Sequence, residues 1–488
     1  MGFKSAAFLS SLLALPLTTV AQSSETVLGV YIFHRHGDRT AKATPPANLT
    51  DLGYREVYER GQYYRSRYVA SDATNPISGL NTDVVRLAQL AVTAPVDNVL
   101  QSSAAGFVQG LYPAAGNAAS QTLRNGTSVE PPLGGFQIIP INIVSNGGAG
   151  SEDNGWLQDA SSCANAETSS NNYFNSAQYQ SLLKSTQSFY DRLDPVVNGS
   201  FSAAQTSFKN AYTIFDLINV AEIHNRTINS SNLLDTPTLF QLRTLADSHE
   251  YGLAYNASDD MRAIAGMQLA GEILDYLNSS ITSFAKHNNK LGIQFGAYGT
   301  FFSFFGLANL TEASPNFFGV PDYASSMVFE LVTTADVSKG APSQDQINVR
   351  FLYHNGTSDN KTEPTAFPLF GQKSETVSWP DFVSNMSGIS VTTTQEWCTK
   401  CGNFTGTCAA FAPSSGSSSS DSGSSSSGGG SHISTAVGGV IGAMVTLGVI
   451  LGVEALILLL GGLRLVSKSR LAGAGVPNGA GTGAAVKA

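Results

Sequence analysis

Basic residues are scarce in this sequence. Its 488 residues include 27 lysines and arginines but 36 aspartates and glutamates, and the formal net charge is −9. Because proteins that bind nucleic acids need a basic surface to neutralise phosphates, this balance argues against a nucleic-acid partner. The chain is nevertheless long enough for a sizeable core and more than one structural unit.

The sequence also contains only four cysteines, and their spacing limits the chemistry that they can perform. Cys398 and Cys401 have the spacing of zinc sites and of thioredoxin-like redox sites. Neither a nearby fourth ligand nor a strand–helix–strand pattern accompanies them, so we expect no metal and no cofactor. We interpret all four as structural disulfides of an oxidising compartment, with one late cysteine reaching Cys163 and the full connectivity left open. The four are Cys163, Cys398, Cys401 and Cys408.

The amino-terminal segment has the layout of a secretory signal. Lys4 precedes an apolar stretch that runs to Ala21, and Thr19-Val20-Ala21 offers small residues for cleavage. We therefore predict a signal peptide over residues 1–21, followed by an extracytoplasmic domain over residues 22–412.

A flexible linker and a transmembrane helix are predicted after that domain. The serine- and glycine-rich residues 413–435 cannot pack a core. Residues 436–463 are apolar apart from Glu454, and they exceed the roughly 20 residues that span a bilayer. Basic residues directly after this stretch place residues 464–488 in the cytoplasm. The sequence thus predicts a single-pass protein of the cell surface or a secretory-pathway membrane, with its N-terminal domain outside the cytoplasm.

Sites for N-linked glycosylation support this export. The chain contains twelve Asn-X-Ser/Thr sequons, a number that selection for a secreted surface explains better than chance. We predict glycosylation at Asn48, Asn125, Asn198, Asn225, Asn229, Asn256, Asn278, Asn309, Asn355, Asn360, Asn385 and Asn403.

A polar cluster follows the first apolar run of the domain. Residues Val27–Phe33 form a short apolar run rich in β-branched and aromatic side chains, which is typical of a buried strand. Directly after them, Arg35 and Arg39 flank His36, and arginine offers a planar fork of donors that matches phosphate oxygens. His36 between these forks has the chemistry of a nucleophile or base aimed at a bound phosphate. The alternative, a basic surface loop, is disfavoured because Arg-His-Gly-X-Arg after a strand is a demanding pattern.

The motif and several later segments resemble the histidine acid phosphatase family, branch 2 of the histidine phosphatases, which includes secreted phytases. The similarity runs from about Thr26 to Cys408. It implies an α/β fold, in which a phosphoglycerate mutase-like sheet domain carries an inserted, mainly helical cap, here over residues 123–258. The segments that carry the similarity beyond the motif are Leu49–Gly53, Gly61–Tyr68, Gly110–Pro113, Arg262–Leu274, Ser326–Leu331 and Val349–Asn355.

Hydrophobic periodicity predicts the elements of this cap and of the segment after it. We interpret His249 and Glu250 as structural and His224 as solvated. The predicted helices are 178–193, 202–222, 239–249 and 259–277, and the predicted late strands are 292–298, 327–331 and 347–352.

The resemblance also implies a two-step phosphoryl transfer. His36 attacks phosphorus and forms a phosphohistidine, which water then hydrolyses. Arg35 and Arg39 hold the phosphate oxygens, where the charge of the transition state is spread. We assign Asp38 to catalysis and Thr40 to substrate binding. The chain is accordingly predicted to be an acid phosphatase that hydrolyses phosphomonoesters.

Two supporting positions depart from the family. Asn98 stands where the family has a third arginine, and an asparagine can donate to phosphate but brings no charge. Ala297 and Tyr298 stand where the family has a phosphate-binding histidine and the aspartate that protonates the leaving oxygen. Loss of a positioned general acid typically removes a factor of about 10²–10⁴ in rate.

Two interpretations therefore stay open. In the first, the chain is a phosphatase in which Asp38 or Tyr298 supplies the proton, and Asn98 and Tyr298 contact the substrate. In the second, it is a catalytically weak or inactive surface glycoprotein that still binds phosphorylated ligands. The intact first motif favours the enzyme.

Few basic residues surround the predicted site. Lys42 is the only lysine close behind the motif, and residues 123–258 contain few lysines and arginines. Phytases hold their polyanionic substrate with a strongly basic pocket. We therefore predict a poor phytase that prefers small or singly phosphorylated esters to inositol hexakisphosphate. The sequence does not indicate an oligomeric state.

Overall fold

The computed structural model describes residues 25–144, 162–224, 227–356 and 362–413. The chain divides into two compact units, residues 1–413 and 414–488, and the described residues all belong to the first. The predicted signal peptide, transmembrane helix and cytoplasmic tail, and all but the first residue of the predicted linker, lie outside the described residues. Within the described part, no helix combines the length and the apolar character that crossing a membrane requires.

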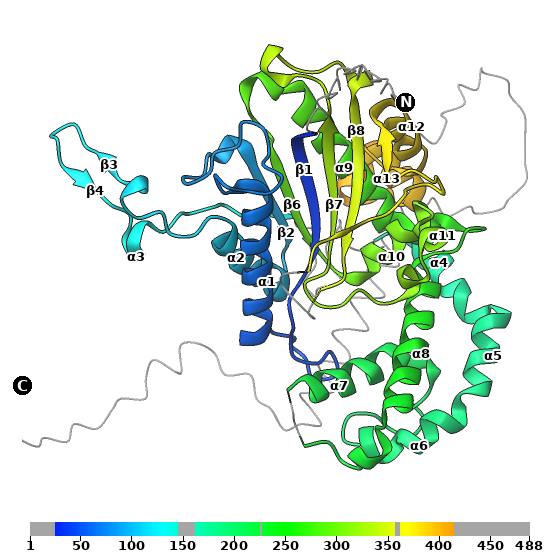
Figure 1. The fold of residues 1–488 in the computed structure, drawn as a ribbon. Coiled ribbons are helices and arrows are strands. Elements are labelled where there is room, and N and C mark those ends of the chain that lie inside the picture. Colours follow the sequence, from blue (N-terminus) through cyan, green and yellow to red (C-terminus); the bar gives the residue numbers. More distant parts are fainter. Residues whose placement is uncertain (1–24, 145–161, 225–226, 357–361, 414–488) are drawn as a thin grey trace, which may run out of the picture. The chain divides into compact units, whose positions relative to one another are not determined.

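A mixed sheet forms the centre of the described part (Figure 1). It has eight strands in the order β10-β8-β7-β1-β6-β2-β5, with β9 paired to β8. β1 runs parallel to β6 and antiparallel to β7. The strands are β1 Thr26–Arg35, β2 Leu90–Pro95, β5 Asn142–Val144, β6 Leu291–Gly296, β7 Ser326–Thr333, β8 Ile347–His354, β9 Thr365–Ala366 and β10 Thr376–Ser378.

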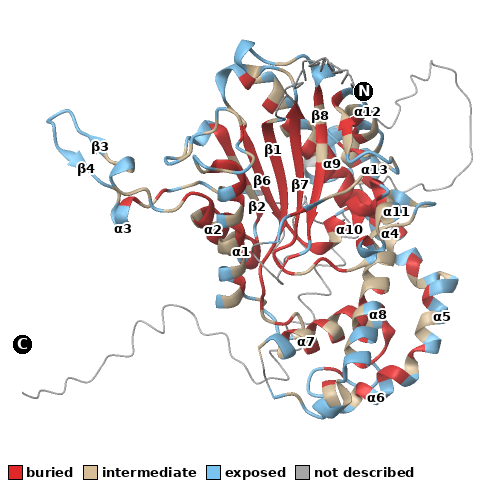
Figure 2. Ribbon diagram, viewed as in Figure 1, coloured by how far each residue is buried: buried red, intermediate tan, exposed pale blue. Residues whose placement is uncertain are grey.

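Strand β1 is buried along nearly its whole length, as Figure 2 shows for the central strands. Successive side chains of a strand point to opposite faces of the sheet. Val30 and Ile32 accordingly belong to one hydrophobic core, whereas Tyr31 and Phe33 belong to another. This two-sided burial explains why the run reads as continuously apolar, and it confirms the predicted strand.

Helices cover both faces of the sheet. On one face lie α1 Asp51–Tyr64 and α2 Asn98–Leu111, which pack against each other. The hydroxyl of Thr50 caps α1 by accepting from the Gly53 N–H. The other face carries α9 Ile264–Thr282, α10 Tyr298–Leu307, α11 Leu310–Ala313 and α12 Trp379–Ile389.

A helical cap with a hydrophobic core of its own lies beyond the sheet (Figure 1). The single helix predicted over residues 178–193 is divided at Thr186, whose hydroxyl donates to the Leu182 carbonyl. The helix predicted from residue 202 begins only at Ala211. The cap helices are α4 Ala164–Asn172, α5 Ala177–Ser185, α6 Gln187–Val197, α7 Ala211–Ile223 and α8 Thr236–Ala254.

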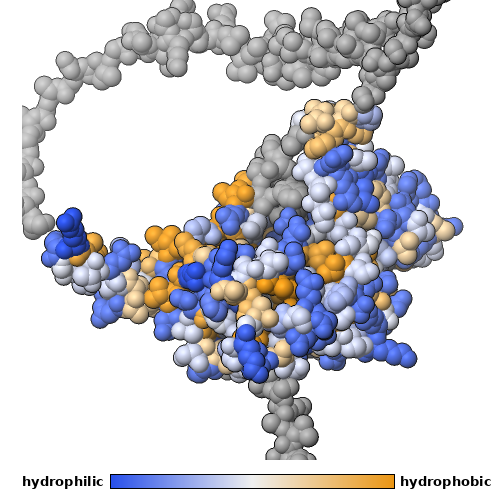
Figure 3. All heavy atoms as spheres, turned by 90° about the horizontal axis from the view of Figure 1, so that it is seen from above, coloured by the Kyte–Doolittle hydropathy of each residue, from blue (hydrophilic) through white to orange (hydrophobic). Residues whose placement is uncertain are grey.

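The sequence assigned residues from 123 onward to the helical cap, but residues 121–144 are not a helical layer. They form the hairpin of β3 Gln121–Thr122 and β4 Ser128–Val129, the single turn α3 Pro132–Gly135, and the sheet strand β5. Two prolines and two glycines within residues 131–135 prevent a longer helix. The hairpin and α3 form an arm that extends to the left in Figures 1 and 3, where hydrophobic residues reach the surface. Leu133 is 82 % exposed and Ile138 is 80 % exposed.

Both disulfides lie at the carboxyl end of the domain. Cys163, just before α4, pairs with Cys401 in α13 Thr394–Cys401, and Cys398 pairs with Cys408. A late cysteine therefore reaches Cys163, as the sequence predicted. The first bond ties the start of the cap to the end of the chain's described part.

Candidate functional site

Three neighbouring parallel strands bring the predicted site residues to one edge of the sheet. β1 ends at Arg35, which pairs with Gly296 at the end of β6, and β2 lies on the other side of β6. His36, Tyr298 and Asn98 follow the ends of these three strands. Ligand sites of α/β sheets form outside the carboxyl ends of strands, so this edge is the candidate site.

His36 is held in one orientation by its own loop. Its side chain is fully buried, and Nδ1 lies 2.7 Å from the Gly37 carbonyl oxygen. Because a carbonyl only accepts, Nδ1 must donate, which leaves the lone pair on Nε2. A Cβ on Gly37 would lie 2.2 Å from the Gly53 carbonyl oxygen, so the loop packs on α1 only with glycine there. The orientation leaves on Nε2, which is itself a buried atom, the lone pair that a nucleophile requires.

The two arginines of the motif are buried and share a partner from the cap. Tyr212 in α7 lies with its hydroxyl 3.5 Å from a terminal nitrogen of Arg35 and 3.4 Å from one of Arg39. Arg35 also donates to the Pro321 carbonyl, and Arg39 forms an ion pair of 3.0 Å with Asp216. Burial raises the pKa of Tyr212 to about 12, so its hydroxyl stays neutral beside both cations. The cap thus positions both guanidinium groups.

A pocket of about 410 Å³ opens beside Arg35. Its walls come from β1, α1, the cap helices α7 and α8, and the loop that precedes β7. Acidic and basic side chains are both present, and two of the three acids are neutralised: Asp216 by Arg39, and Asp322 by Arg243 at 2.8 Å. The lining residues are Arg35, Leu52, Glu56, Tyr212, Phe215, Asp216, Asn219, Ile223, Arg243, Val320, Pro321, Asp322 and Tyr323.

Glu56 is the third acid of this pocket, and sequence reasoning missed it. It lies on α1, and its Oε2 accepts from the Asp38 backbone N–H at 2.8 Å. Burial raises the pKa of its carboxyl group to about 7, and the negative charge of Asp38 acts in the same direction. Glu56 is therefore a protonated or easily protonated acid beside the histidine loop.

Asp38 and Thr40 make hydrogen bonds that stabilise the loop that carries the motif. Asp38 is fully buried, and its Oδ2 accepts from the Thr50 hydroxyl and lies 2.7 Å from Nε2 of His224. The Thr40 hydroxyl accepts from the Asn48 N–H at 2.9 Å. Neither residue lines the pocket. His224, which we expected to be solvated, is instead a partner of the motif.

The residues at the two divergent positions lie at the predicted edge but have different surroundings. Asn98 is exposed and donates to Asn48 at 2.8 Å. Tyr298 is buried, its ring centroid lies 5.4 Å from the Arg35 guanidinium, and its hydroxyl donates to Glu250 at 2.7 Å. Neither residue lines the pocket beside Arg35.

Glu250 and His249 form a buried pair behind Tyr298. The second oxygen of Glu250 lies 2.7 Å from Nδ1 of His249, whose ring is surrounded by aromatic side chains. This packing agrees with the structural interpretation of the pair.

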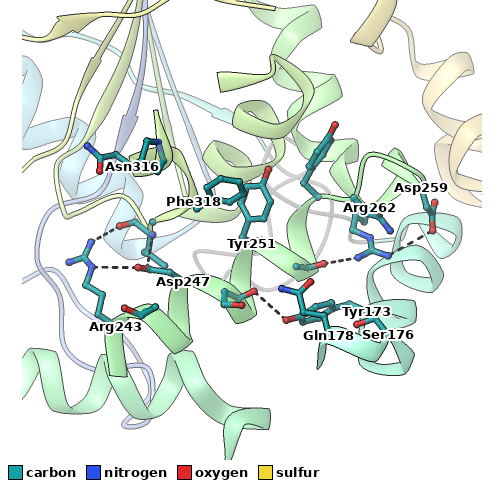
Figure 4. A pocket seen from close by; sticks show the side chains of 18 of the residues that line it. Tyr173, Ser176, Gln178, Arg243, Asp247, Tyr251, Asp259, Arg262, Asn316 and Phe318 are labelled. Carbon is teal, nitrogen blue, oxygen red and sulfur yellow. Dashed lines mark hydrogen bonds and ion pairs between the residues drawn. The ribbon is translucent and has the colours of Figure 1, made fainter. Parts of the chain in front are cut away.

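A second and larger pocket, of about 1130 Å³, adjoins the first (Figure 4). Arg243 and Val320 line both pockets. Its charged side chains bind one another or the backbone: Arg243 donates to the Val320 carbonyl at 2.8 Å, and Arg262 donates to the Gly252 carbonyl at 2.6 Å and lies 3.9 Å from Asp259. Its remaining walls are largely aromatic and amide side chains. Among the described residues, no group of three or more histidine, cysteine, aspartate or glutamate side chains is placed to hold a metal ion.

The comparisons with known proteins agree with this architecture. The model of the histidine phosphatase superfamily (branch 2) matches residues 44–354, which is more than half of the chain and begins after the Arg35–Arg39 motif. The phytase of Citrobacter braakii has a similar fold, with a TM-score of 0.52 and 14 % identity over 77 % of this chain and 99 % of its own. The phytase of Klebsiella sp. ASR1 also has a similar fold, with a TM-score of 0.51 and 12 % identity over 75 % of this chain and 95 % of its own. No curated protein matches the sequence. The chain belongs to branch 2 of the histidine phosphatase superfamily.

Proposed function

We propose that this protein is an acid phosphatase that hydrolyses phosphomonoesters through a phosphohistidine intermediate. The observation that carries the proposal is the geometry of His36, whose Nδ1 is committed to the Gly37 carbonyl between two buried arginines. Family membership supports a phosphatase-type hydrolase. Nε2 of His36 would attack phosphorus, and water would later cleave the resulting N–P bond.

The two arginines supply the electrostatic part of the mechanism. Phosphoryl transfer spreads negative charge over the equatorial oxygens, and preorganised cations stabilise that charge. Arg35 and Arg39 are held by Tyr212, Pro321 and Asp216 before any ligand binds. Among the described residues, Nε of Arg35 has no hydrogen-bond partner, so this donor is available to a phosphate oxygen.

The test is to look for turnover and for the intermediate. Purified protein should release phosphate from p-nitrophenyl phosphate at acid pH. Quenching into alkali during turnover should trap a phosphoenzyme that survives alkali and is lost in acid, as the N–P bond of phosphohistidine is. Turnover without such an adduct would contradict the covalent mechanism.

A second candidate function is favoured by one observation. Ala297 and Tyr298 occupy the end of β6, where the family has its histidine and acid, so the chain could bind phosphorylated ligands at the cell surface without turning them over. Inorganic phosphate binding in a calorimeter, with no release from any phosphomonoester, would decide for this alternative.

We further propose that the domain acts outside the cytoplasm, at the cell surface or on a secretory-pathway membrane. Both disulfides fit an oxidising compartment. The asparagines of the described sequons are all exposed or half-exposed, so glycans could attach to them without unfolding. Peptide N-glycosidase treatment of the native protein, followed by mass measurement, tests the glycosylation.

Inositol hexakisphosphate is expected to be a poor substrate. The pocket beside Arg35 places Glu56, Asp216 and Asp322 among its arginines, so it lacks the positive field that concentrates a polyanion. We expect kcat/KM for inositol hexakisphosphate to be at least about 10-fold below that for p-nitrophenyl phosphate, the factor that corresponds to about 1.4 kcal/mol. Equal or higher values for the hexakisphosphate would contradict this substrate assignment.

A further inference from the structure

The position that should hold the leaving-group acid contains none. β6 ends at Gly296, and the next residues are Ala297, which has no titratable group, and Tyr298. The Tyr298 hydroxyl donates to Glu250, so its proton is already committed. A phosphatase built on His36 therefore needs its acid from another element.

One carboxyl group lines the pocket without a basic partner among the described residues. Asp216 is bound to Arg39, and Asp322 is bound to Arg243. Glu56 instead accepts one backbone N–H, that of Asp38, two residues after the nucleophile. This bond fixes Oε2 on the loop and leaves Oε1 for another partner.

The remaining acids near the motif are not placed for the task. Asp38 is fully buried, and its Oδ2 is engaged by Thr50 and His224. Its Oδ1 has no hydrogen-bond partner in the described part of the chain but is buried, and Asp38, like His36, does not line the pocket. Glu250 is also outside that lining, and both of its oxygens are engaged, by Tyr298 and by His249.

We propose that Glu56 is the proton donor to the leaving oxygen, in place of the acid missing after β6. The inference rests on the proposed phosphatase function. As Nε2 of His36 forms its bond to phosphorus, the bond from phosphorus to the ester oxygen breaks and that oxygen takes the proton of Glu56. In the second step, the Glu56 carboxylate takes a proton from water, whose oxygen bonds to phosphorus as the N–P bond breaks. The carboxyl group is restored, and phosphate leaves.

The charges around Glu56 keep this acid protonated under mildly acidic conditions. Burial in the pocket and the negative charge of Asp38 raise the pKa of Glu56 to about 7, while Arg35 and Arg55 oppose the rise. A group with this pKa gives up its proton at little cost near neutral pH. Because the protonated form is the acid, rates that depend on it should fall as pH rises through about 7. The other titratable side chains that line the same pocket are Tyr212, Asp216, Arg243, Asp322 and Tyr323.

The experiment compares two leaving groups in wild-type protein and in the variant Glu56→Gln. Glutamine keeps an oxygen for the Asp38 N–H but cannot donate an acidic proton. For glycerol 2-phosphate, whose alkoxide leaves poorly, kcat/KM should fall about 10²-fold or more. For 2,4-dinitrophenyl phosphate, whose phenolate needs no proton, kcat/KM should change by less than about 3-fold, because kcat/KM reports the first step and no proton transfer assists this departure. The matched control is Glu59→Gln, which makes the same substitution one turn further along α1, at a residue that does not line the pocket.

The outcomes separate this inference from the proposed function. If the wild type hydrolyses neither ester, the phosphatase assignment fails. If it hydrolyses both, but Glu56→Gln lowers kcat/KM for both esters equally or for neither, then Glu56 is not the acid. Should the variant not fold, the wild type still decides: a decline above pH 7 for glycerol 2-phosphate, absent for the dinitrophenyl ester, supports Glu56, and parallel pH profiles refute it.

Discussion

Replacing His36 by alanine is expected to abolish turnover while phosphate binding persists. The side chain supplies the only nucleophile of the proposed mechanism, and removal of such a group typically costs a factor of about 10⁴ or more in kcat. Arg35 and Arg39 keep their partners Tyr212 and Asp216 in the variant, so the anion site should survive. Steady-state kinetics with p-nitrophenyl phosphate measure the first effect, and calorimetric titration with inorganic phosphate measures the second.

A control is needed because His36 is fully buried, and its loss leaves a cavity beside Tyr323. His34→Ala provides it. His34 is also fully buried, two residues earlier in β1, and burial lowers the pKa of its imidazole to about 3, so it is a neutral packing residue against Phe107 and Phe295. The two variants should lose similar stability in thermal unfolding, but only His36→Ala should lose hydrolysis. Comparable kinetic losses would remove His36 from the nucleophile's role.

The local pattern of apolar residues was enough to predict the strands that carry the site. A run that is apolar on both faces predicts a buried strand, and β1 is one; the apolar runs near residues 292, 327 and 347 likewise became β6, β7 and β8. Because the carboxyl ends of parallel strands meet at one edge, the motif after β1 and the pair after β6 had to lie close together. The first inference needs only the period of side chains along a strand, whereas the second also needed the family resemblance, which identified the residues after β6 as part of the site.

The partners of the motif could not be predicted in the same way. Tyr212 and Asp216 come from α7, 177 residues after the arginines that they contact, and no periodicity links residues so far apart. Glu56 was missed for another reason. It occupies a polar position on an amphipathic helix, where the default interpretation is a solvated face. Its place in the lining of the pocket and its hydrogen bond from the Asp38 N–H appear only in the three-dimensional structure.

The start of the cap was predicted incorrectly because the sheet strand that lies there, β5, is very short. β5 has three residues, too few to show alternation, and it follows an arm whose exposed Leu133 and Ile138 resemble core residues in sequence. Pairing with β2 supplies the hydrogen bonds that make β5 a strand, and that pairing is invisible in the local sequence.

Replacing Asp216 by alanine is expected to destabilise the fold and to weaken catalysis together. Its carboxylate lies 3.0 Å from the Arg39 guanidinium and accepts a hydrogen bond from the Lys42 backbone N–H at 2.8 Å. The side chain of Arg39 is 0 % exposed and that of Asp216 is 2 % exposed. Removing one partner of a buried ion pair costs about 3–5 kcal/mol because the remaining charge stays desolvated. Urea unfolding followed by circular dichroism should report this loss, and KM for p-nitrophenyl phosphate should rise because Arg39 is no longer oriented.

Two further variants show whether the charge pair itself is responsible. Asp216→Asn retains one acceptor oxygen and should fall between the wild type and Asp216→Ala in both measurements. Lys339→Ala removes one partner of an exposed pair, that between Lys339 and Asp336 at 3.3 Å, and should leave unfolding and kinetics unchanged because solvent screens such pairs. If Asp216→Ala were as stable and as active as Lys339→Ala, the cap would not position Arg39. Asp216 is the carboxylate through which α7 neutralises Arg39 in the described part of the chain, so such a result would mean that α7 does not orient the arginines of the candidate site.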